Sequence, residues 1–156
     1  MLLTFLLLPG MASPLSTPAA ADDSAAQARA APDAERRNDF PVAVSEYRIL
    51  ASRYLHNAEV LSNLGVALYF NHQLQPAIDI LRKAISLNPD LLAPHLFSGL
   101  AWFRLSNPDA AVPQLEKAVH LHPSDVLATT WLGYAYSAQA RYRPAATEFE
   151  AASRLD

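Results

Sequence analysis

Small residues recur along this chain at a fixed interval of 34 positions, and this period constrains the fold more than any other feature. Gly65, Gly99 and Gly133 stand 34 residues apart. Two series of alanines keep the same interval, namely Ala77, Ala111 and Ala145, and Ala84, Ala118 and Ala152. A period of about 20–50 residues indicates stacked supersecondary units that share one core. The chain is therefore expected to be a solenoid.

Each period contains two apolar patterns with helical spacing, separated by a short turn. Proline ends the second pattern at Asn88-Pro89 and at His122-Pro123, because proline cannot extend the helical hydrogen-bond ladder. Pro113 lies inside one predicted helix, where we expect a kink or a late start. The predicted helices are Ala58–Phe70, Leu74–Leu87, Leu92–Leu105, Pro108–Leu121, Val126–Gln139 and Tyr142–Leu155.

The segment before the clear repeats shows a weaker form of the same pattern. Phe40–Tyr54 has helical spacing, with Asp39 as its N-cap, and it shares the register of the later second helices. Residues 39–57 are thus predicted to hold the second helix of a degenerate first repeat. Residues 22–38 are polar and alanine-rich, and are interpreted as a linker or a frayed helix with little to bury. The clear repeats are predicted at 58–91, 92–125 and 126–156.

The first 21 residues have the features of a signal peptide. Leu2–Leu8 is an apolar run, and Ala19-Ala20-Ala21 fits an A-x-A cleavage pattern. No Lys or Arg precedes the run, which is atypical for such a signal. The run is also too short to cross a membrane, which takes roughly 20 apolar residues. Residues 1–21 therefore predict a periplasmic or secreted protein, with a cytoplasmic protein as the alternative.

Composition and motifs exclude several functional classes. The net charge is −3 without a basic run, so nucleic acid is not an expected partner. The chain has no cysteine, hence no disulfide and no thiolate metal site. His120 and His122 are the only close pair of histidines, and helical positions two apart point to different sides. We find no phosphate-binding glycine loop and no G-x-S-x-G elbow. We predict no metal, no cofactor and no catalytic residue.

The repeated positions resemble the signature of the tetratricopeptide repeat family, which is W-x₂-L-G-x₂-Y followed by alanine, an aromatic residue and proline. The first clear unit offers Leu61, Leu64, Gly65, Leu68, Ala77, Leu81, Ala84 and Pro89. The next two offer His95, Ser98, Gly99, Trp102, Ala111, Leu115, Ala118 and Pro123, then Thr129, Leu132, Gly133, Tyr136, Ala145, Phe149 and Ala152. The resemblance implies an all-α, right-handed α-solenoid of stacked antiparallel helix pairs, with three clear repeats and a degenerate first one.

The small residues of the signature are expected to set the spacing between the helices. We predict that Gly65 faces Ala77 and Ala84 on the next helix, where a larger side chain would push the two axes apart. Large residues such as Leu68 and Leu81 would fill the remaining space.

In solenoids of this family, the first helix of each pair lines a concave groove that commonly holds an extended peptide or a partner helix. By that resemblance the groove residues are Glu59, Ser62, Asn63, Val66, Tyr69, Phe70, Leu96, Phe97, Leu100, Phe103, Arg104, Thr130, Trp131 and Tyr134. The stripe is apolar and aromatic, as binding hot spots often are, and Arg104 is its only basic residue. An acidic C-terminal tail is therefore a disfavoured ligand. An alternative is that the same aromatic residues pack between neighbouring repeats.

The leading functional hypothesis is a non-catalytic scaffold for protein–protein interaction, which binds a protein or peptide through this apolar groove. The alternative is a structural section of a longer array that associates with itself through the last repeat, since that repeat has no polar capping helix after it. An enzyme is a remote alternative, because no catalytic constellation supports it. We expect no stable membrane span once the signal is removed.

Overall fold

A computed structural model describes residues 29–155, in which every regular element is a helix. The predicted signal peptide and residues 22–28 lie outside the described residues. Residues 29–36 are helical and precede the labelled helices. The labelled helices are α2 (Phe40–Arg53), α3 (Ala58–Phe70), α4 (Leu74–Leu87), α5 (Leu92–Arg104), α6 (Pro108–Leu121), α7 (Val126–Ala138) and α8 (Tyr142–Leu155).

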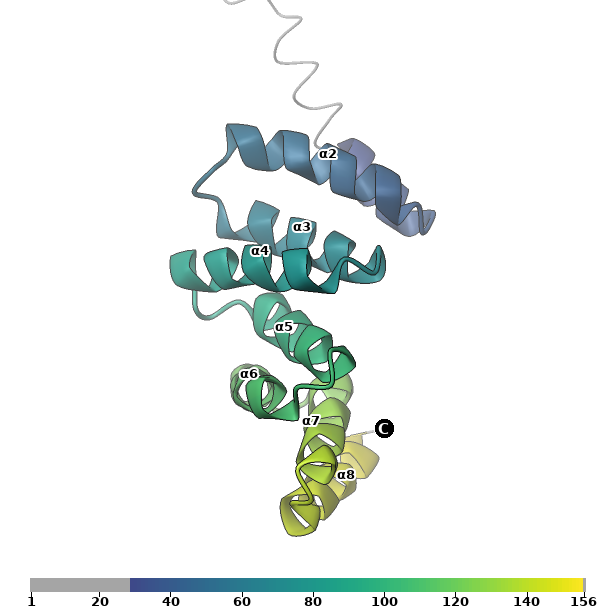
Figure 1. The fold of residues 1–156 in the computed structure, drawn as a ribbon, viewed down its shortest axis with the longest axis vertical. Helices are drawn as coiled ribbons and strands as arrows, with labels where there is room; N and C mark the ends of the chain where they lie inside the picture. Colours follow the sequence, from purple (N-terminus) through teal and green to yellow (C-terminus); the bar gives the residue numbers. More distant parts are fainter. Residues whose placement is uncertain (1–28, 156) are drawn as a thin grey trace, which may run out of the picture.

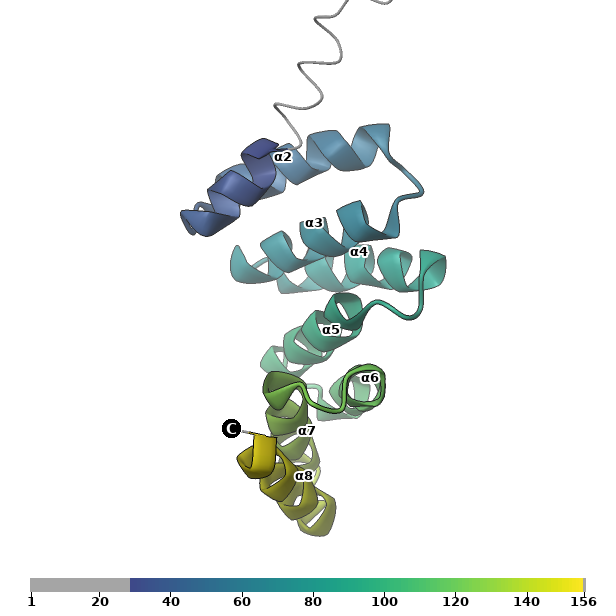
Figure 2. The same cartoon turned by 180° about the vertical axis from the view of Figure 1, so that it is seen from behind.

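The helices stack in chain order along the long axis of the molecule, and their directions turn progressively from α2 to α8 (Figures 1 and 2). The closest packing joins α3 to α4, α5 to α6 and α7 to α8, and each pair then packs on the next. The first helices α3, α5 and α7 also contact one another in succession, so they share one side of the stack. The predicted all-α solenoid of helix pairs is confirmed. None of the helices within residues 29–155 is long and apolar enough to cross a membrane.

The helix boundaries follow from local capping. The Asn57 side chain accepts a hydrogen bond from the Val60 N–H at 3.0 Å, and Asn107 caps Ala110 in the same way at 3.1 Å. Because Asn107 caps α6 at its first turn, the helix begins at Pro108, and the late start predicted at Pro113 is wrong. A kink there stays a prediction.

The turn inside each repeat has the same geometry four times along the chain. Its central residue has a positive φ at Asn38, His72, Ser106 and Ala140, between 57° and 60°. In each turn the next residue donates its N–H to a carbonyl five positions back, which is the Schellman pattern at a helix C-terminus. The turn at Asn38 therefore ends the first helix of an N-terminal unit, which we define as residues 29–57.

This N-terminal unit buries more than its sequence suggested. Ala31 and Ala34 are completely buried, and the Tyr47 hydroxyl of α2 donates to the Glu35 carboxylate at 3.1 Å. For residues 29–36 the linker interpretation is therefore wrong, and so is the expectation of little to bury. The physical reason is that alanine lets two helices approach closely while contributing almost nothing to an apolar pattern.

The signature glycines make room for one large side chain on the partner helix. A Cβ atom on Gly65 would lie 2.4 Å from Leu81 Cδ2, and one on Gly99 would lie 2.5 Å from Leu115 Cγ. Leu81 and Leu115 are fully buried. The predicted close approach is confirmed: Leu81 is the nearest neighbour of Gly65, and the Ala111 carbonyl oxygen, in the position that corresponds to Ala77, lies 3.3 Å from a Cβ on Gly99. The glycine accommodates a leucine that fills the helix interface.

Candidate functional site

Aromatic side chains on α3, α5 and α7 form a line across two junctions between repeats. We call the set Tyr69, Phe70, Phe97, Phe103, Trp131 and Tyr134 the aromatic seam. Tyr69 meets Phe97 edge to face, with ring centroids 5.3 Å apart and an interplanar angle of 65°. One period later, Phe103 meets Trp131 at 5.4 Å and 69°. The same inter-repeat contact is thus made twice, in a favourable geometry for aromatic pairs.

At each end of the seam, an aromatic residue from the second helix of a repeat unit contacts the last ring. Phe40, the first residue of α2, stacks on Phe70 at 4.9 Å with an interplanar angle of 18°. Phe149 of α8 meets Tyr134 at 5.1 Å and 68°. The groove prediction included neither residue. Phe149 occupies the aromatic position of the repeat signature, which was a usable signal, whereas no signal in the sequence pointed to Phe40.

The predicted groove residues divide into three groups by exposure. The exposed group is Glu59, Asn63, Phe70, Arg104 and Tyr134, and the half-buried group is Val66, Phe97, Phe103, Thr130 and Trp131. Ser62, Tyr69, Leu96 and Leu100 are buried. Of these four, Tyr69, Leu96 and Leu100 belong to the buried apolar core that the helices share. The packing interpretation therefore holds for part of the aromatic surface, and the rest of that surface faces solvent.

The seam carries one cation. The Arg104 guanidinium lies over the Tyr69 ring, 5.1 Å from its centroid, and its Nη2 lies 3.1 Å from His72 Nδ1. Arg104 is exposed, so it can also meet a ligand. Glu59 stands exposed in the first turn of α3, which places it at the opposite end of that helix from Tyr69. Between them the stripe presents the exposed Asn63 and the half-buried Val66.

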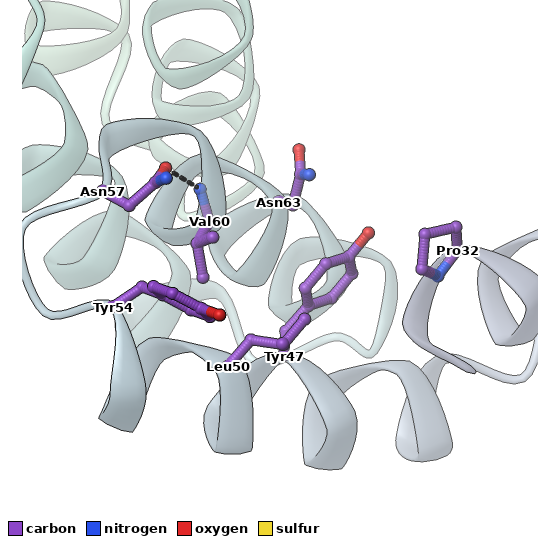
Figure 3. Close-up of a pocket in the computed structure, with 7 residues that line it drawn as sticks. All are labelled: Pro32, Tyr47, Leu50, Tyr54, Asn57, Val60 and Asn63. Atoms are coloured by element: carbon purple, nitrogen blue, oxygen red, sulfur yellow. Dashed lines mark hydrogen bonds between the residues drawn. The ribbon is translucent and has the colours of Figure 1, made fainter. Parts of the chain in front are cut away.

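The seam ends at the junction between the N-terminal unit and the repeat 58–91. Asn63 stands there at the position that Phe97 and Trp131 hold one and two periods later. A cavity of about 290 Å³ opens beside Asn63 (Figure 3). Its walls are Pro32, Tyr47, Leu50, Tyr54, Asn57, Val60 and Asn63.

Two buried tyrosines that do not belong to the seam, Tyr47 and Tyr136, donate hydrogen bonds to carboxylates. The Tyr136 hydroxyl donates to Glu116 Oε1 at 2.5 Å, and burial together with this hydrogen bond raises the pKa of Tyr136 to about 12. Burial, followed by the negative charge of Glu35, raises the pKa of Tyr47. Burial is also the main cause that raises the pKa of Glu148, with a smaller contribution from Glu116. Both tyrosines keep their protons at neutral pH, so neither is a general base.

The histidines offer no metal site within the described residues. No group of three or more His, Asp or Glu in residues 29–155 could hold an ion. His95 is buried, with 5% exposed. Its Nδ1 lies 3.0 Å from Gln114 Oε1 and its Nε2 lies 3.0 Å from the Pro89 carbonyl oxygen. His95 therefore ties α5 to α6 and to the preceding turn.

Known proteins match both the sequence and the fold. A family model described as tetratricopeptide repeat matches residues 28–91 and 98–156. MamA residues 41 to the end from Desulfovibrio magneticus RS-1 is 23% identical, with a TM-score of 0.79 over 86% of this chain and 76% of that chain. Another crystal structure of MamA is 23% identical, with a TM-score of 0.74 over 80% and 73%. Pseudomonas aeruginosa PilF is 22% identical, with a TM-score of 0.76 over 84% and 60%. At these identities the structural likeness shows the fold alone.

Proposed function

Since the chain belongs to the tetratricopeptide repeat family, whose fold suggests a protein–protein interaction scaffold, we propose that it is a non-catalytic scaffold that binds a peptide or partner helix along the aromatic seam. The solvent-facing part of the seam carries this proposal. Phe70 and Tyr134 remain 42% and 48% exposed although both touch other aromatic rings. Exposed aromatic residues grouped on one face are typical of contact surfaces.

Neighbouring aromatic rings also fix the exposed rings of the seam in position. Phe70 contacts Phe40, Tyr69 and Phe97, and Tyr134 contacts Trp131 and Phe149. Rings held by several neighbours lose little rotamer entropy when a ligand covers them, which favours affinity. The expected partner presents apolar side chains to the two exposed rings. An acidic side chain placed near Arg104 would add a charge-assisted hydrogen bond.

Selection from a library of displayed peptides tests this function. The wild type should enrich peptides with apolar anchors, and the Phe103→Ala/Tyr134→Ala variant should lose at least about tenfold in affinity for them, since hot-spot truncations remove about 2 kcal/mol or more. Tyr142→Ala is the matched control, because Tyr142 is 69% exposed but belongs to the second helix of its repeat. Equal binding by all three proteins would refute the role of the seam.

The alternative of self-association through the last repeat finds little support in the residues of α8. Ile78 on α4 is 4% exposed and packs beneath the next repeat, whereas Ala146, at the same position of α8, is exposed. Ile85 of α4 likewise corresponds to Ser153, which is also exposed. A face of this composition offers a second copy little apolar area. Light scattering should therefore find a monomer, and a concentration-dependent dimer would support self-association instead.

Export of the protein is a separate proposal. It rests on the apolar run Leu2–Leu8 and on the A-x-A pattern at Ala19-Ala20-Ala21. N-terminal sequencing of protein made in its own cells tests it. A new N-terminus at Asp22 supports a cleaved signal and a periplasmic or secreted scaffold, whereas an intact Met1 on cytosolic protein would contradict it.

A further inference from the structure

The signature leucine is replaced by serine in the repeat 92–125, and the smaller side chain borders a cavity. Leu64 and Leu132 fill the equivalent position in the neighbouring repeats and are buried, with 4% and 3% exposed. Ser98 is equally buried, with 3% exposed. Beside it lies a cavity of about 150 Å³, which we call the Ser98 pocket. Its walls are Ile78, Arg82, Ile85, Ser98, Trp102 and Gln114.

Ser98 places a buried polar side chain at the wall of the Ser98 pocket. A serine hydroxyl can both donate and accept a hydrogen bond. The Gln114 side chain is fixed at another wall, because its Oε1 lies 3.0 Å from His95 Nδ1. A ligand hydroxyl at this wall could form a hydrogen bond with Ser98.

The one charged side chain among the walls of this pocket is paired. Arg82 Nη2 donates to Asp79 Oδ1 at 2.5 Å, with 74% of the Arg82 side chain and 47% of the Asp79 side chain exposed. The Asp79 carboxylate beside Arg82 disfavours an anionic ligand. The remaining walls are the two isoleucines and the Trp102 ring, which favour an uncharged, apolar body.

The size and the walls together define a ligand class. The pocket's volume of about 150 Å³ is large enough for one benzene ring, and its walls combine three apolar side chains with the polar Arg82, Ser98 and Gln114. We propose that the Ser98 pocket binds a small neutral aromatic alcohol, with its ring between Ile78, Ile85 and Trp102 and its hydroxyl on Ser98. This site is formed by α4, α5 and α6 and shares no residue with the aromatic seam, so its test is independent of the proposed scaffold function.

Titrations with phenol and with toluene, followed by two-dimensional NMR of the full chain, test the proposal. Phenol should give saturable shifts at the Ser98 amide and at the Trp102 indole N–H. Ser98→Ala removes the hydroxyl and should weaken phenol binding about fivefold, the value of one hydrogen bond, while toluene binding stays within twofold. Ser98→Leu restores the residue of the neighbouring repeats, so it should abolish binding of both probes and raise the Tm.

Two outcomes would overturn the proposal. One is the absence of saturable shifts with either probe in the wild type. The other is phenol binding to Ser98→Leu with wild-type affinity, which would place the ligand elsewhere. If Ser98→Leu does not fold, the ratio of phenol to toluene affinity in Ser98→Ala still decides the question, because an unchanged ratio would exclude a role for the hydroxyl.

Discussion

The first junction of the solenoid and the two that follow are built from the same positions with different side chains. Between the N-terminal unit and the repeat 58–91, these positions hold Glu35 and Asn63. One period later they hold Tyr69 and Phe97, and two periods later Phe103 and Trp131, in nearly identical edge-to-face contacts. The first junction contains a cavity of about 290 Å³ beside Asn63.

This difference shows that the helix stack and the aromatic seam are separate properties. The first junction stacks through buried small and apolar residues, among them Ala31 and Ala34, and its aromatic contact is the Phe40–Phe70 stack between α2 and α3. The later junctions keep the same turn and the same helix packing and add edge-to-face pairs between their first helices. Because a junction can stack without such a pair between its first helices, these rings are available for another role, and this supports binding as the function of the seam.

The largest expected effect comes from the glycine positions that all clear repeats share. Gly99→Leu should destabilise the protein by about 3 kcal/mol or more, since even a Cβ there would lie 2.5 Å from Leu115 Cγ. Asp90→Ala removes only an exposed contact with Lys117 and should stay within about 0.5 kcal/mol. Chemical denaturation of both variants gives the two values. Equal stabilities would contradict the close-packing account.

At the second junction we expect a loss of stability that is smaller than that of Gly99→Leu but larger than the loss at the first junction. Phe97→Ala should cost about 2 kcal/mol, because the half-buried ring packs against Tyr69 and Phe70. Asn63→Ala is the matched variant one period earlier and should cost less than about 0.5 kcal/mol, since Asn63 is exposed. Urea denaturation measures the pair. Comparable losses would show that the two junctions depend equally on this position.

The repeated turn predicts a stabilising substitution. Ala140 has a φ of 58°, a left-handed conformation that glycine adopts without strain. Ala140→Gly should therefore stabilise the protein by about 0.5–1 kcal/mol. Asn38→Gly at the first turn should gain less, because asparagine tolerates this conformation better than alanine. Thermal unfolding of both variants checks the order, and a lower Tm for Ala140→Gly would contradict it.

The smallest effect depends on pH. Because the folded state raises the pKa of Glu148, it binds this proton more tightly than the unfolded chain does. The resulting stabilisation is present below the unfolded pKa of about 4.3 and is lost as pH rises through the folded pKa. Glu148→Gln should therefore unfold at a higher temperature than wild type at pH 7, and the difference should vanish at pH 3.5.

Calorimetry at these two values of pH measures the difference for Glu148→Gln. Glu150→Gln serves as the control, because Glu150 is an exposed residue on the same helix. If both variants give the same gain at neutral pH, a general reduction of charge on α8 explains the effect, and the local cause proposed for Glu148 does not hold.

The period of 34 residues predicted most of the helix boundaries, because glycine, alanine and proline mark turns and close contacts directly. It could not locate the neighbours of each helix face. Tyr69 and Leu100 belong to the predicted stripe but are buried, since both are part of the core that the helices share. Phe40 contributes to the seam across the stack, and no local pattern reveals such a contact.

The sequence also did not reveal the surroundings of two other parts of the chain. His95 is buried, and its two ring nitrogens lie 3.0 Å from oxygen atoms of Gln114 and Pro89 in two other segments, which no local pattern reveals. The helix at 29–36 was underestimated because alanines pack well without producing an amphipathic pattern. In both cases the missing information is tertiary.

Site-specific photocrosslinking in the cell tests the central claim most directly. A photoreactive phenylalanine analogue placed at Phe70 or at Tyr134 should crosslink to the same partner protein, because both rings face solvent on the seam. The same analogue at Tyr142 is more exposed but lies off the seam, and it should give no such adduct. A partner captured at Tyr142 but at neither Phe70 nor Tyr134, or no adduct at any of the three positions, would contradict the seam as the binding surface.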